Sequence, residues 1–259
     1  MTRFAFGQNW KSFVRVVDDE RVAEAEKALA PLDLAGKSFL DVGCGSGLSS
    51  LAARNLGARV VAFDYDRESV TAAALLRERF RPGDPDWRIE QGDVLDPDYL
   101  KRLGKFDVVY AWGVLHHTGE MWRALENCLL PLDPGGLLCV ALYNDQGALS
   151  RRWLRVKRIY NVSAAGRALV LGLGVPYLAL RQALWSIRLR RNLFPASGRG
   201  MSMLNDWVDW LGGYPFEFAS YASVIQFCKA RGLELVRGTP SNAGNNQFVF
   251  VRSSAGATP

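Results

Sequence analysis

The sequence predicts an α/β protein with one doubly wound, mostly parallel sheet of seven strands, an antiparallel C-terminal strand and a helical insert. Strand-like apolar segments alternate with helix-like segments through the first half of the chain, which is typical of right-handed crossover connections. A glycine-rich turn joins the first strand to the helix that follows it. The last two strand-like segments have no helix between them, which indicates an antiparallel hairpin at one sheet edge.

Each expected element has a local reason. Segment 37–45, "KSFLDVGCG", is an apolar strand that opens into glycine, and segment 48–57 carries Leu48 and Leu51 at helical spacing before Gly57 ends it. The other expected elements are strands at 58–66, 87–94, 105–113 and 135–143, helices at 67–80 and 120–130, and a last helix at 221–232 followed by strands at 233–240 and 245–253.

This pattern divides the chain into five segments. Residues 1–33 are expected to form an N-terminal lid segment with a helix, and residues 34–145 an α/β core that binds a cofactor. Residues 146–218 are a basic helical insert, where open α/β sheets normally use only a few residues. Residues 219–253 return to the core with the last helix and the closing strand pair, and 254–259 are expected to be a disordered tail.

Charge and cysteine content exclude several classes of protein. The net charge of +6 is concentrated between Gln146 and Asn205, which holds eleven Lys or Arg and no Asp or Glu, so no nucleic-acid partner is expected. The four cysteines form no C-x-x-C pair, which indicates no disulfide framework or zinc site and fits a reducing cytoplasm. We expect no signal peptide, and no apolar run reaches the ~18 residues of a membrane-spanning helix.

The glycine-rich turn indicates a cofactor that contains adenosine. Gly43, Gly45 and Gly47 lie between a strand and a helix, where bare backbone can approach a ligand closely. Asp64 ends the second strand at an offset suited to a ribose diol; glycines that only make a tight turn would leave that carboxylate unexplained. Asp41 precedes the first glycine by two positions. A carboxylate there would repel a pyrophosphate but suits an ammonium and a sulfonium.

At this point the sequence resembles the class I S-adenosylmethionine-dependent methyltransferases, whose first motif is an acidic residue, a variable residue and then G-x-G-x-G. "LDVGCGSG" and "VLHH" are also similar to bacterial small-molecule and quinone-biosynthesis methyltransferases. The resemblance covers about residues 38–143 and implies a Rossmann-like methyltransferase fold with S-adenosyl-L-methionine as cofactor. It places Gly43, Cys44 and Gly45 against the methionine portion. The cofactor-binding set that follows is Trp10, Asp41, Gly43, Cys44, Gly45, Gly47, Asp64 (ribose), Tyr65 (adenine), Asp93 (adenine amino group), Val94 and Trp112. Asp93 has the alternative role of capping a turn.

The only two histidines, His116 and His117, follow the fourth expected strand. In the family that the sequence resembles, this strand ends near the transferred methyl group. Successive side chains on an extended backbone point to opposite sides, so the two histidines are not expected to face the same substrate together. For the same reason they are a poor pair of metal ligands. Because an imidazole with a pKa of ~6.5 suits a base at neutral pH, one of them is a candidate catalytic residue. The alternative is that both are structural.

The segments outside the core suggest how an acceptor is enclosed. "FGQNWKSF" resembles the opening of a subset of bacterial methyltransferases, which would make Trp10 and Phe13 lid aromatics and Phe4 or Phe6 anchors; plain core packing is the alternative. The basic insert has three interpretations: contact with an anionic membrane surface, arginines turned toward an anionic acceptor, or a structural cap. The candidate acceptor residues are Tyr143, Asn144, Asp209, Trp210, Tyr214 and Glu217, although a junction between domains would have the same composition.

These observations predict a methyltransferase that acts on a small or lipid-like acceptor, most readily at oxygen, in the cytoplasm or at the inner membrane surface. Two alternatives belong to other classes. An NAD-dependent oxidoreductase would need a turn that tolerates pyrophosphate, and Asp41 argues against it. A non-methylating protein on the same fold would bind the cofactor and transfer nothing.

Overall fold

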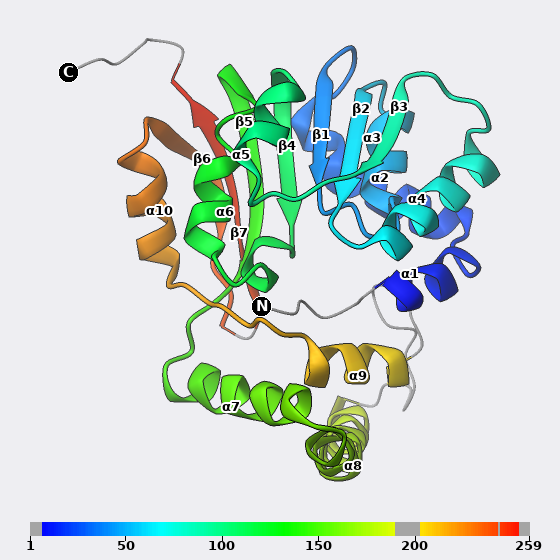
Figure 1. Ribbon diagram of the computed structural model, residues 1–259, viewed down its shortest axis with the longest axis vertical. Coiled ribbons are helices and arrows are strands. Elements are labelled where there is room, and N and C mark those ends of the chain that lie inside the picture. Colours follow the sequence, from blue (N-terminus) through cyan, green and yellow to red (C-terminus); the bar gives the residue numbers. More distant parts are fainter. Residues whose placement is uncertain (1–6, 190–202, 243, 254–259) are drawn as a thin grey trace.

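A computed structural model describes residues 7–189, 203–242 and 244–253 of the chain. These residues form a seven-stranded sheet in the order β3-β2-β1-β4-β5-β7-β6 (Figure 1). The strands are β1 (Ser38–Val42), β2 (Arg59–Asp64), β3 (Trp87–Gln91), β4 (Phe106–Trp112), β5 (Leu132–Tyr143), β6 (Leu233–Thr239) and β7 (Asn245–Arg252). Phe4, Phe6 and the expected tail lie outside the described residues.

The strand directions confirm the predicted fold class. The first five strands pair in parallel, β7 is antiparallel to β5, and β6 is antiparallel to β7. The closing hairpin therefore lies at one sheet edge. In a doubly wound sheet of this kind, ligands bind at the carboxyl ends of the parallel strands, near the point where the strand order reverses between β1 and β4.

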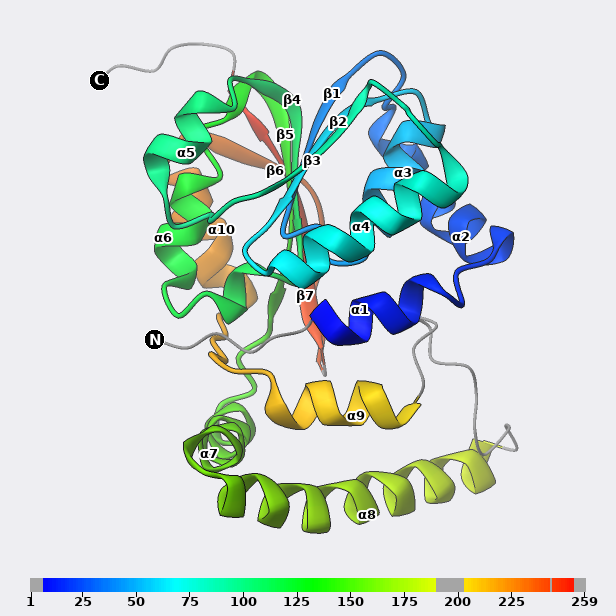
Figure 2. The ribbon, with the colours of Figure 1, turned by 45° about the vertical axis from the view of Figure 1, so that its right-hand side comes forward.

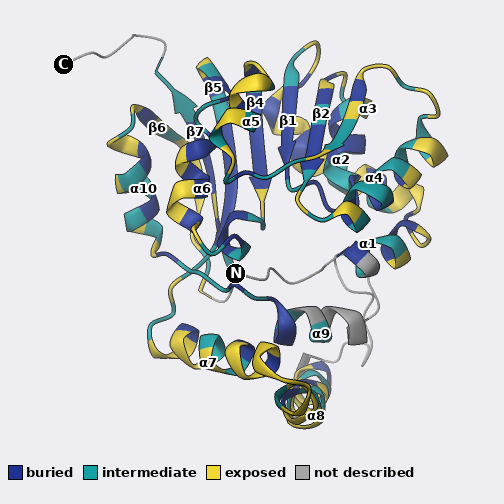
Figure 3. Ribbon diagram, in the orientation of Figure 1, coloured by how far each residue is buried: buried dark blue, intermediate teal, exposed yellow. Residues whose placement is uncertain are grey.

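Helices cover both faces of the sheet (Figure 2). The helices of the described residues are α1 (Gly7–Val14), α2 (Asp19–Leu29), α3 (Leu48–Asn55), α4 (Arg67–Phe80), α5 (Pro97–Arg102), α6 (Met121–Asn127), α7 (Ala148–Val162), α8 (Ala164–Leu189), α9 (Met203–Gly212) and α10 (Tyr221–Lys229), with short 3-10 turns η1 (Ala30–Leu32) and η2 (Leu115–His117). Alternate strand residues face α2, α3 and α4 on one side and α5, α6 and α10 on the other. The central strands β1 and β4 are consequently almost entirely buried, whereas the edge strand β6 is mostly intermediate or exposed (Figure 3).

Two short helices were not predicted from the sequence. The first is α5, where Asp96 accepts hydrogen bonds from the N–H groups of Asp98 and Tyr99 and Pro97 is the first helical residue. An Asp-Pro pair is a typical helix start, so the signal was present, but a six-residue helix has little periodicity to detect. The second is α1, whose N-terminal Gly7 donates to the carboxylate of Asp66 at 2.9 Å.

The insert is helical in its described part, as predicted, and lies beyond the carboxyl ends of the strands (Figures 1 and 2). Glycines and Pro176 interrupt the apolar stretch of the insert in the sequence, but α8 is one continuous helix through Pro176. By length and composition, Ala164–Arg188 is apolar enough to cross a membrane, so the expectation that no segment qualifies was wrong. Leu211 of α9 packs against Gly174 near the middle of α8, so the chain returns alongside this helix.

The two ends of the insert meet at a narrow base. Asn144, just after β5, forms an isolated parallel bridge with Ala219, just before α10. The N–H of Asp145 donates to the carbonyl of Ala219 at 3.1 Å, and the N–H of Ala219 donates to the carbonyl of Tyr143 at 3.0 Å. The chain therefore leaves the core and re-enters it at adjacent points.

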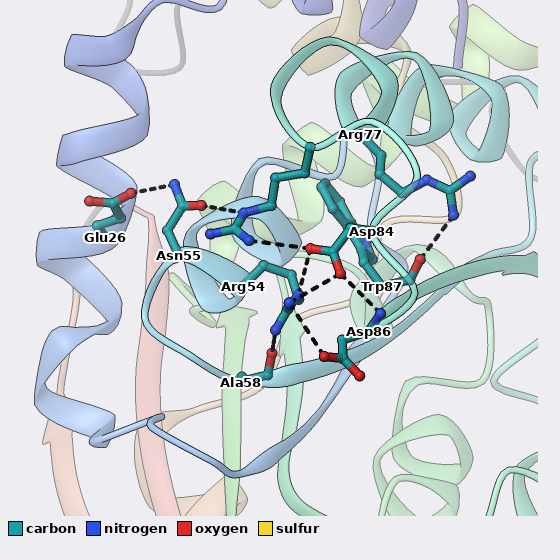
Figure 4. A network of polar contacts seen from close by, with 9 residues as sticks. Glu26, Arg54, Asn55, Ala58, Arg77, Asp84, Asp86 and Trp87 are labelled. Atoms are coloured by element: carbon teal, nitrogen blue, oxygen red, sulfur yellow. Dashed lines mark hydrogen bonds and ion pairs between the residues drawn. The ribbon is translucent and has the colours of Figure 1, made fainter.

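A polar network holds the turn between α4 and β3 against α2 and α3 (Figure 4). Arg54 donates two hydrogen bonds to Asp84, at 3.0 and 3.1 Å, and both side chains are nearly buried, at 11% and 8% exposed. Arg81 bridges Asp84 to Asn55, which in turn donates to Glu26 at 2.6 Å. The network lies away from the carboxyl ends of the strands and is structural.

Asp84 makes the stability of the fold depend on pH. Burial alone would raise the pKa of Asp84, but hydrogen bonds from Arg54 and from the N–H of Asp86 outweigh it and hold the pKa below its usual value. A carboxylate whose folded pKa is lowered stabilises the fold above its unfolded pKa. This stabilisation is lost as the pH falls through the folded pKa.

We predict that Asp84→Asn lowers the free energy of unfolding by about 3 kcal/mol at pH 7, because it leaves the buried guanidinium of Arg54 without its charged partner. The difference between variant and wild type should shrink as the pH falls through the lowered pKa of Asp84, because the wild-type carboxylate then loses its charge. Urea unfolding at pH 7 and at a series of acid pH values measures this. Asp98→Asn is the matched control, since its pair with Lys101 is exposed, and it should cost no more than about 0.5 kcal/mol. Equal losses in the two variants would contradict the prediction.

Candidate functional site

The turn from β1 into α3 is crowded on every side. Gly43, Gly45 and Gly47 all have positive φ angles, at 72°, 53° and 80°. A Cβ on Gly43 would lie 2.5 Å from a methyl carbon of Val114, and one on Gly45 would lie 3.0 Å from the indole of Trp10. Conformation and space together require glycine at the first two positions.

Trp10 covers this turn from the N-terminal side. Its helix, α1, packs along α4 through the Gly7–Asp66 hydrogen bond and an ion pair between Lys11 and Glu68. The half-buried indole of Trp10 lies against Gly45, which is the position expected of a lid aromatic. Phe13 is instead a core residue, 4% exposed, and meets Trp10 edge-on at 5.8 Å between ring centroids.

Two carboxylates lie behind the glycine turn. Asp41 is buried, and one of its oxygens accepts the hydroxyl of Ser50 at 2.6 Å. Burial, with a further contribution from the charge of Asp64, raises the pKa of Asp41 to about 7. Asp64 accepts the N–H groups of Gly45 and Asp66 at 3.0 and 2.9 Å, and burial raises its pKa to about 6. Without a ligand, ionisation of Asp41 and Asp64 therefore costs free energy.

Five other predicted cofactor residues lie at or just after the ends of β1, β2, β3 and β4. Tyr65 is half exposed directly after β2, and Trp112 is partly exposed at the end of β4, stacked on Tyr110 at 5.2 Å. Asp93 accepts the N–H of Leu95 at 2.9 Å, which is the turn-capping geometry foreseen as its alternative role. The last two predicted residues, Val94 and Cys44, are buried, and burial raises the pKa of the Cys44 thiol.

The histidines do not lie on an extended strand, so the expectation that they point to opposite sides was wrong. Gly113 has a φ of 79° and turns the chain into η2, which brings the two rings to 4.5 Å between centroids. His116 is buried, and its Nδ1 accepts the N–H of Tyr143 at 3.3 Å. His117 is half-buried, and its Nδ1 lies 2.8 Å from the carbonyl oxygen of Pro215. The two histidines therefore contact the end of the neighbouring strand β5 and the segment after α9.

Tyr143, at the end of β5, joins the histidines to residues 213–218, the last part of the insert after α9. Its ring lies 3.8 Å from that of His116, 5.5 Å from that of His117 and 5.0 Å from that of Phe216. Glu217 donates its N–H to the carbonyl of His116, and its carboxylate accepts the first N–H of α6. Burial raises the pKa of Glu217. Tyr214, half-buried, precedes Pro215 through a cis peptide bond.

The other predicted acceptor residues lie apart from this cluster. The Asn144 amide donates to the carbonyl of Ser241 and accepts from Asn246, so both ends of its side chain serve the loop between β6 and β7. Trp210 packs in the interior of the insert against Trp153, at 3.9 Å between centroids. The side chain of Asp209 lies outside the described residues.

Sequence reasoning missed two residues that connect these parts. Lys157 is 1% exposed; its ammonium donates to the carbonyl of Trp210 and lies 4.9 Å from the centre of the Phe216 ring. Among so many arginines it reads as one more solvated cation, and no sequence signal sets it apart. The second residue, Val114, contacts Gly43 and links the histidine turn to the glycine turn.

The residues at the glycine turn fit S-adenosylmethionine. A nearby positive charge would lower the raised pKa of Asp41 and of Asp64, because an opposite charge favours the carboxylate form. The ammonium and sulfonium of S-adenosylmethionine supply such a charge, whereas a dinucleotide pyrophosphate would add repulsion. Asp41 would hold the amino-acid end, Asp64 the ribose diol, and the backbone of Gly43 to Gly45 the methionine portion.

Comparison with known families agrees with this geometry. Residues 40–138 match the family described as "Methyltransferase domain". This match spans β1 to β5, the part of the sheet that holds the glycine turn and both carboxylates. Residues 40–138 form a class I S-adenosylmethionine-dependent methyltransferase domain.

Relatives of this methyltransferase domain include two proteins named "Ubiquinone biosynthesis O-methyltransferase". The protein from Xanthomonas oryzae pv. oryzae is 36% identical over 117 residues, which is 44% of this chain and 46% of the relative. The protein from a Bradyrhizobium species is 34% identical over 111 residues, which is 43% of this chain and 42% of the relative. The matches thus span less than half the length of these relatives.

Solved structures share the fold over most of the chain. Magnesium protoporphyrin IX methyltransferase from Synechocystis, crystallised with bound SAH, has a TM-score of 0.54 at 18% identity and covers 98% of this chain and 90% of its own. An O-methyltransferase family protein from Burkholderia thailandensis has a TM-score of 0.55 at 14% identity, over 93% of this chain and 62% of its own. At this identity the likeness shows the fold alone.

We predict that Asp41→Asn stabilises the free protein at pH 8. Because the folded pKa of Asp41 is raised to about 7, its contribution to stability is full below its unfolded pKa and is lost as the pH rises through 7. An amide keeps the hydrogen bond from Ser50 without the charge, so the free energy of unfolding should rise by on the order of 1 kcal/mol or more. Urea unfolding at pH 8 measures the change.

Asp107→Asn is the control of opposite sign. Hydrogen bonds from the hydroxyl and N–H of Ser38 hold the pKa of Asp107 below its usual value, so neutralising it should destabilise the protein at pH 8. If both variants lose stability, the prediction that the ionised form of Asp41 destabilises the free protein is wrong.

Proposed function

We propose that this protein transfers the methyl group of S-adenosylmethionine to an oxygen atom of a small or lipid-like acceptor. The observation that carries the proposal is a pair of carboxylates with raised pKa values, buried Asp41 and half-buried Asp64, behind a glycine turn at the carboxyl ends of the parallel strands. The histidine cluster lies beside this turn, because Val114 contacts Gly43 only two residues before His116.

The residues of the chain contribute chiefly by holding the reactants. When bound, the cofactor supplies an electrophilic methyl group on a positively charged sulfur. Asp41 neutralises the ammonium, Asp64 orients the ribose, and Trp10 covers the turn and excludes water. Methyl transfer is an in-line displacement, and correct positioning of two reactants contributes several kcal/mol on its own, up to roughly 7–11 kcal/mol in ideal cases.

An aromatic acceptor suits the surfaces next to the histidines. Tyr143 of β5 and Phe216, in the last part of the insert after α9, lie with 5.0 Å between their ring centroids. The relatives named for ubiquinone biosynthesis are O-methyltransferases by name, which supports transfer to oxygen. We therefore propose a phenol or catechol, free or attached to a lipid tail, as the acceptor class.

The direct test is binding of S-adenosylmethionine followed by methyl transfer. Isothermal titration should detect S-adenosylmethionine and not NAD, and Asp64→Asn should weaken binding at least tenfold, equivalent to about 1.4 kcal/mol. Asp107→Asn, at the opposite end of the sheet, should leave the affinity unchanged. A panel of catechols and hydroxyquinols with labelled methyl donor then identifies the acceptor. An absence of binding, or tighter binding of NAD, would refute the proposal.

We also propose that the insert rests on an anionic membrane surface at the cytoplasmic side, close to a lipid-like acceptor. Residues spaced three and four apart place six exposed apolar side chains on one face of α8: Leu169, Leu173, Tyr177, Leu180, Leu184 and Ile187. Arg181 and Arg188 border this face with Trp185, in a shallow groove. An apolar face beside arginines is the composition of helices that lie in a lipid interface. Leu211 packing on Gly174 supports a helix that lies flat, because α9 runs back beside it.

We predict that the protein co-sediments with vesicles rich in phosphatidylglycerol and not with neutral phosphatidylcholine vesicles at low salt. Arg181→Gln combined with Arg188→Gln should weaken this binding about tenfold or more, since each arginine near an anionic surface contributes about 1 kcal/mol. Leu180→Gln with Leu184→Gln should weaken it at any salt concentration. Val236→Gln, at an exposed apolar position on β6, is the control and should have no effect. Equal binding to neutral and anionic vesicles would contradict the proposal.

A further inference from the structure

One carboxylate, that of Asp66, serves the first turns of two helices. Its Oδ1 accepts the N–H of Glu68 at 2.9 Å and so caps the start of α4. Its Oδ2 accepts the N–H of Gly7, the first residue of α1, also at 2.9 Å. A carboxylate is favoured at a helix N-terminus by the helix dipole and by the N–H groups of the first turn, so Asp66 stabilises both helix starts. The start of α1 is thereby held at the start of α4.

The contact between the two helix starts is too close for a side chain at position 7. A Cβ on Gly7 would lie 2.8 Å from the backbone nitrogen of Ser69 and would collide with the Cβ of Glu68. Both atoms belong to the first turn of α4, so neither can move aside as the end of a flexible side chain can. Gly7 is buried in this contact. A residue with a Cβ would fit here only if the start of α1 moved away from α4.

The other end of α1 is anchored in the core. Phe13 and Val14 are 4% and 5% exposed, and Arg79, in the last turn of α4, donates to the carbonyl of Val14 at 3.0 Å. Helix α1 therefore lies along α4 (Figure 2). Lys11 and Glu68 form an ion pair between the two ends, but both side chains are more than a third exposed, so the pair contributes little. One end of α1 is thus packed in the core, and the other depends on Asp66.

Trp10 lies between these two ends, on the side of the glycine turn. A Cβ on Gly45 would lie 3.0 Å from the indole, so the ring covers the backbone that would hold the methionine portion of the cofactor. Release of the first turn would let α1 swing about its anchored end and would carry the indole away from Gly45. The N–H of Asp66 also donates to the carboxylate of Asp64 at 2.9 Å. A single turn of chain therefore joins the ribose carboxylate to the start of α1.

We propose that Asp66 is a positioning residue that holds α1, and with it Trp10, over bound S-adenosylmethionine and so slows dissociation of the cofactor; this inference rests on the proposed function. Asp66 acts through the N–H of Gly7 rather than on the reacting atoms. Entry and exit of the cofactor require the first turn of α1 to leave Asp66, while Phe13 and Val14 keep the helix attached. The residence time of the cofactor is thus set outside the donor site.

Replacement of Asp66 by serine tests the shared contact. A serine hydroxyl caps α4 about as well as a carboxylate, but it offers one oxygen where two are used. We expect the dissociation rate of S-adenosylmethionine, measured by surface plasmon resonance, to rise about tenfold or more, because a hydrogen bond to a charged group is lost. Asp96→Ser is the matched control, since among the described helices Asp96 caps α5 alone. It should leave the dissociation rate unchanged.

Hydrogen exchange tests the position of α1 without the cofactor. The amides of residues 11–13 bond to carbonyls of the first turn of α1, so their exchange in the free protein should speed up about tenfold or more in Asp66→Ser. The amides of residues 71–80, within α4, should stay protected. A general loss of structure would speed exchange in both segments, which separates it from release of α1.

Gly7→Ala separates the contact from the charge, because Asp66→Ser also removes a negative charge two residues from Asp64. Gly7→Ala changes no charge but introduces the Cβ that collides with α4, so it should reproduce the faster dissociation and the faster exchange. Gly172→Ala, in α8, is its control, since a Cβ there would meet no atom within 4 Å. Lys11→Gln should raise the dissociation rate no more than about threefold, because its ion pair is exposed.

The proposal and the proposed function fail in different ways. If the wild-type protein binds S-adenosylmethionine but dissociation is unchanged in Asp66→Ser and Gly7→Ala, or equally fast in their controls, only the role of Asp66 is overturned. If the wild-type protein binds no S-adenosylmethionine, the proposed function falls, and with it the role of Asp66 in cofactor release, even where exchange in the free protein shows that Asp66 holds α1.

Discussion

A carboxylate buried at the end of β1 is the constraint on which the rest of the structure depends. Asp41 is 3% exposed and accepts the hydroxyl of Ser50 at 2.6 Å, and burial raises the pKa of Asp41 to about 7. Such a group weakens the free fold and strengthens the binding of a cation. The residues around it pack closely: a side chain at Gly43 would collide with Val114, and one at Gly45 would collide with Trp10. Trp10 also covers the turn from outside.

A short series of contacts connects the glycine turn with Tyr143 and Phe216. Val114 lies on Gly43, and two residues later His116 stacks on Tyr143 of β5. Tyr143 in turn meets Phe216, over which the ammonium of Lys157 in α7 is placed. Close packing makes such a series stiff, so a shift of the insert is transmitted to the histidine turn rather than absorbed.

The strands and helices of the core could be predicted because each has its own hydrophobic periodicity in the sequence. Asp41 and Asp64 could be found because their separation from the glycines along the chain is visible in the sequence. What failed depends on single residues or on distant partners. Gly113 turns the backbone out of the extended form, so the two histidines lie together rather than apart. Pro176 removes one helical hydrogen bond, yet α8 continues through it because α9 packs alongside. The burial of Lys157 is decided by tertiary packing alone.

The narrow base of the insert, where Asn144 pairs with Ala219, brings the two ends of the insert together. Because the chain leaves and re-enters the core at adjacent points, an insert of another length or sequence could close at the same base without changing the strand order or the glycine turn. The sheet with its glycine turn is then the constant part of the fold, and the insert is the part that can be replaced.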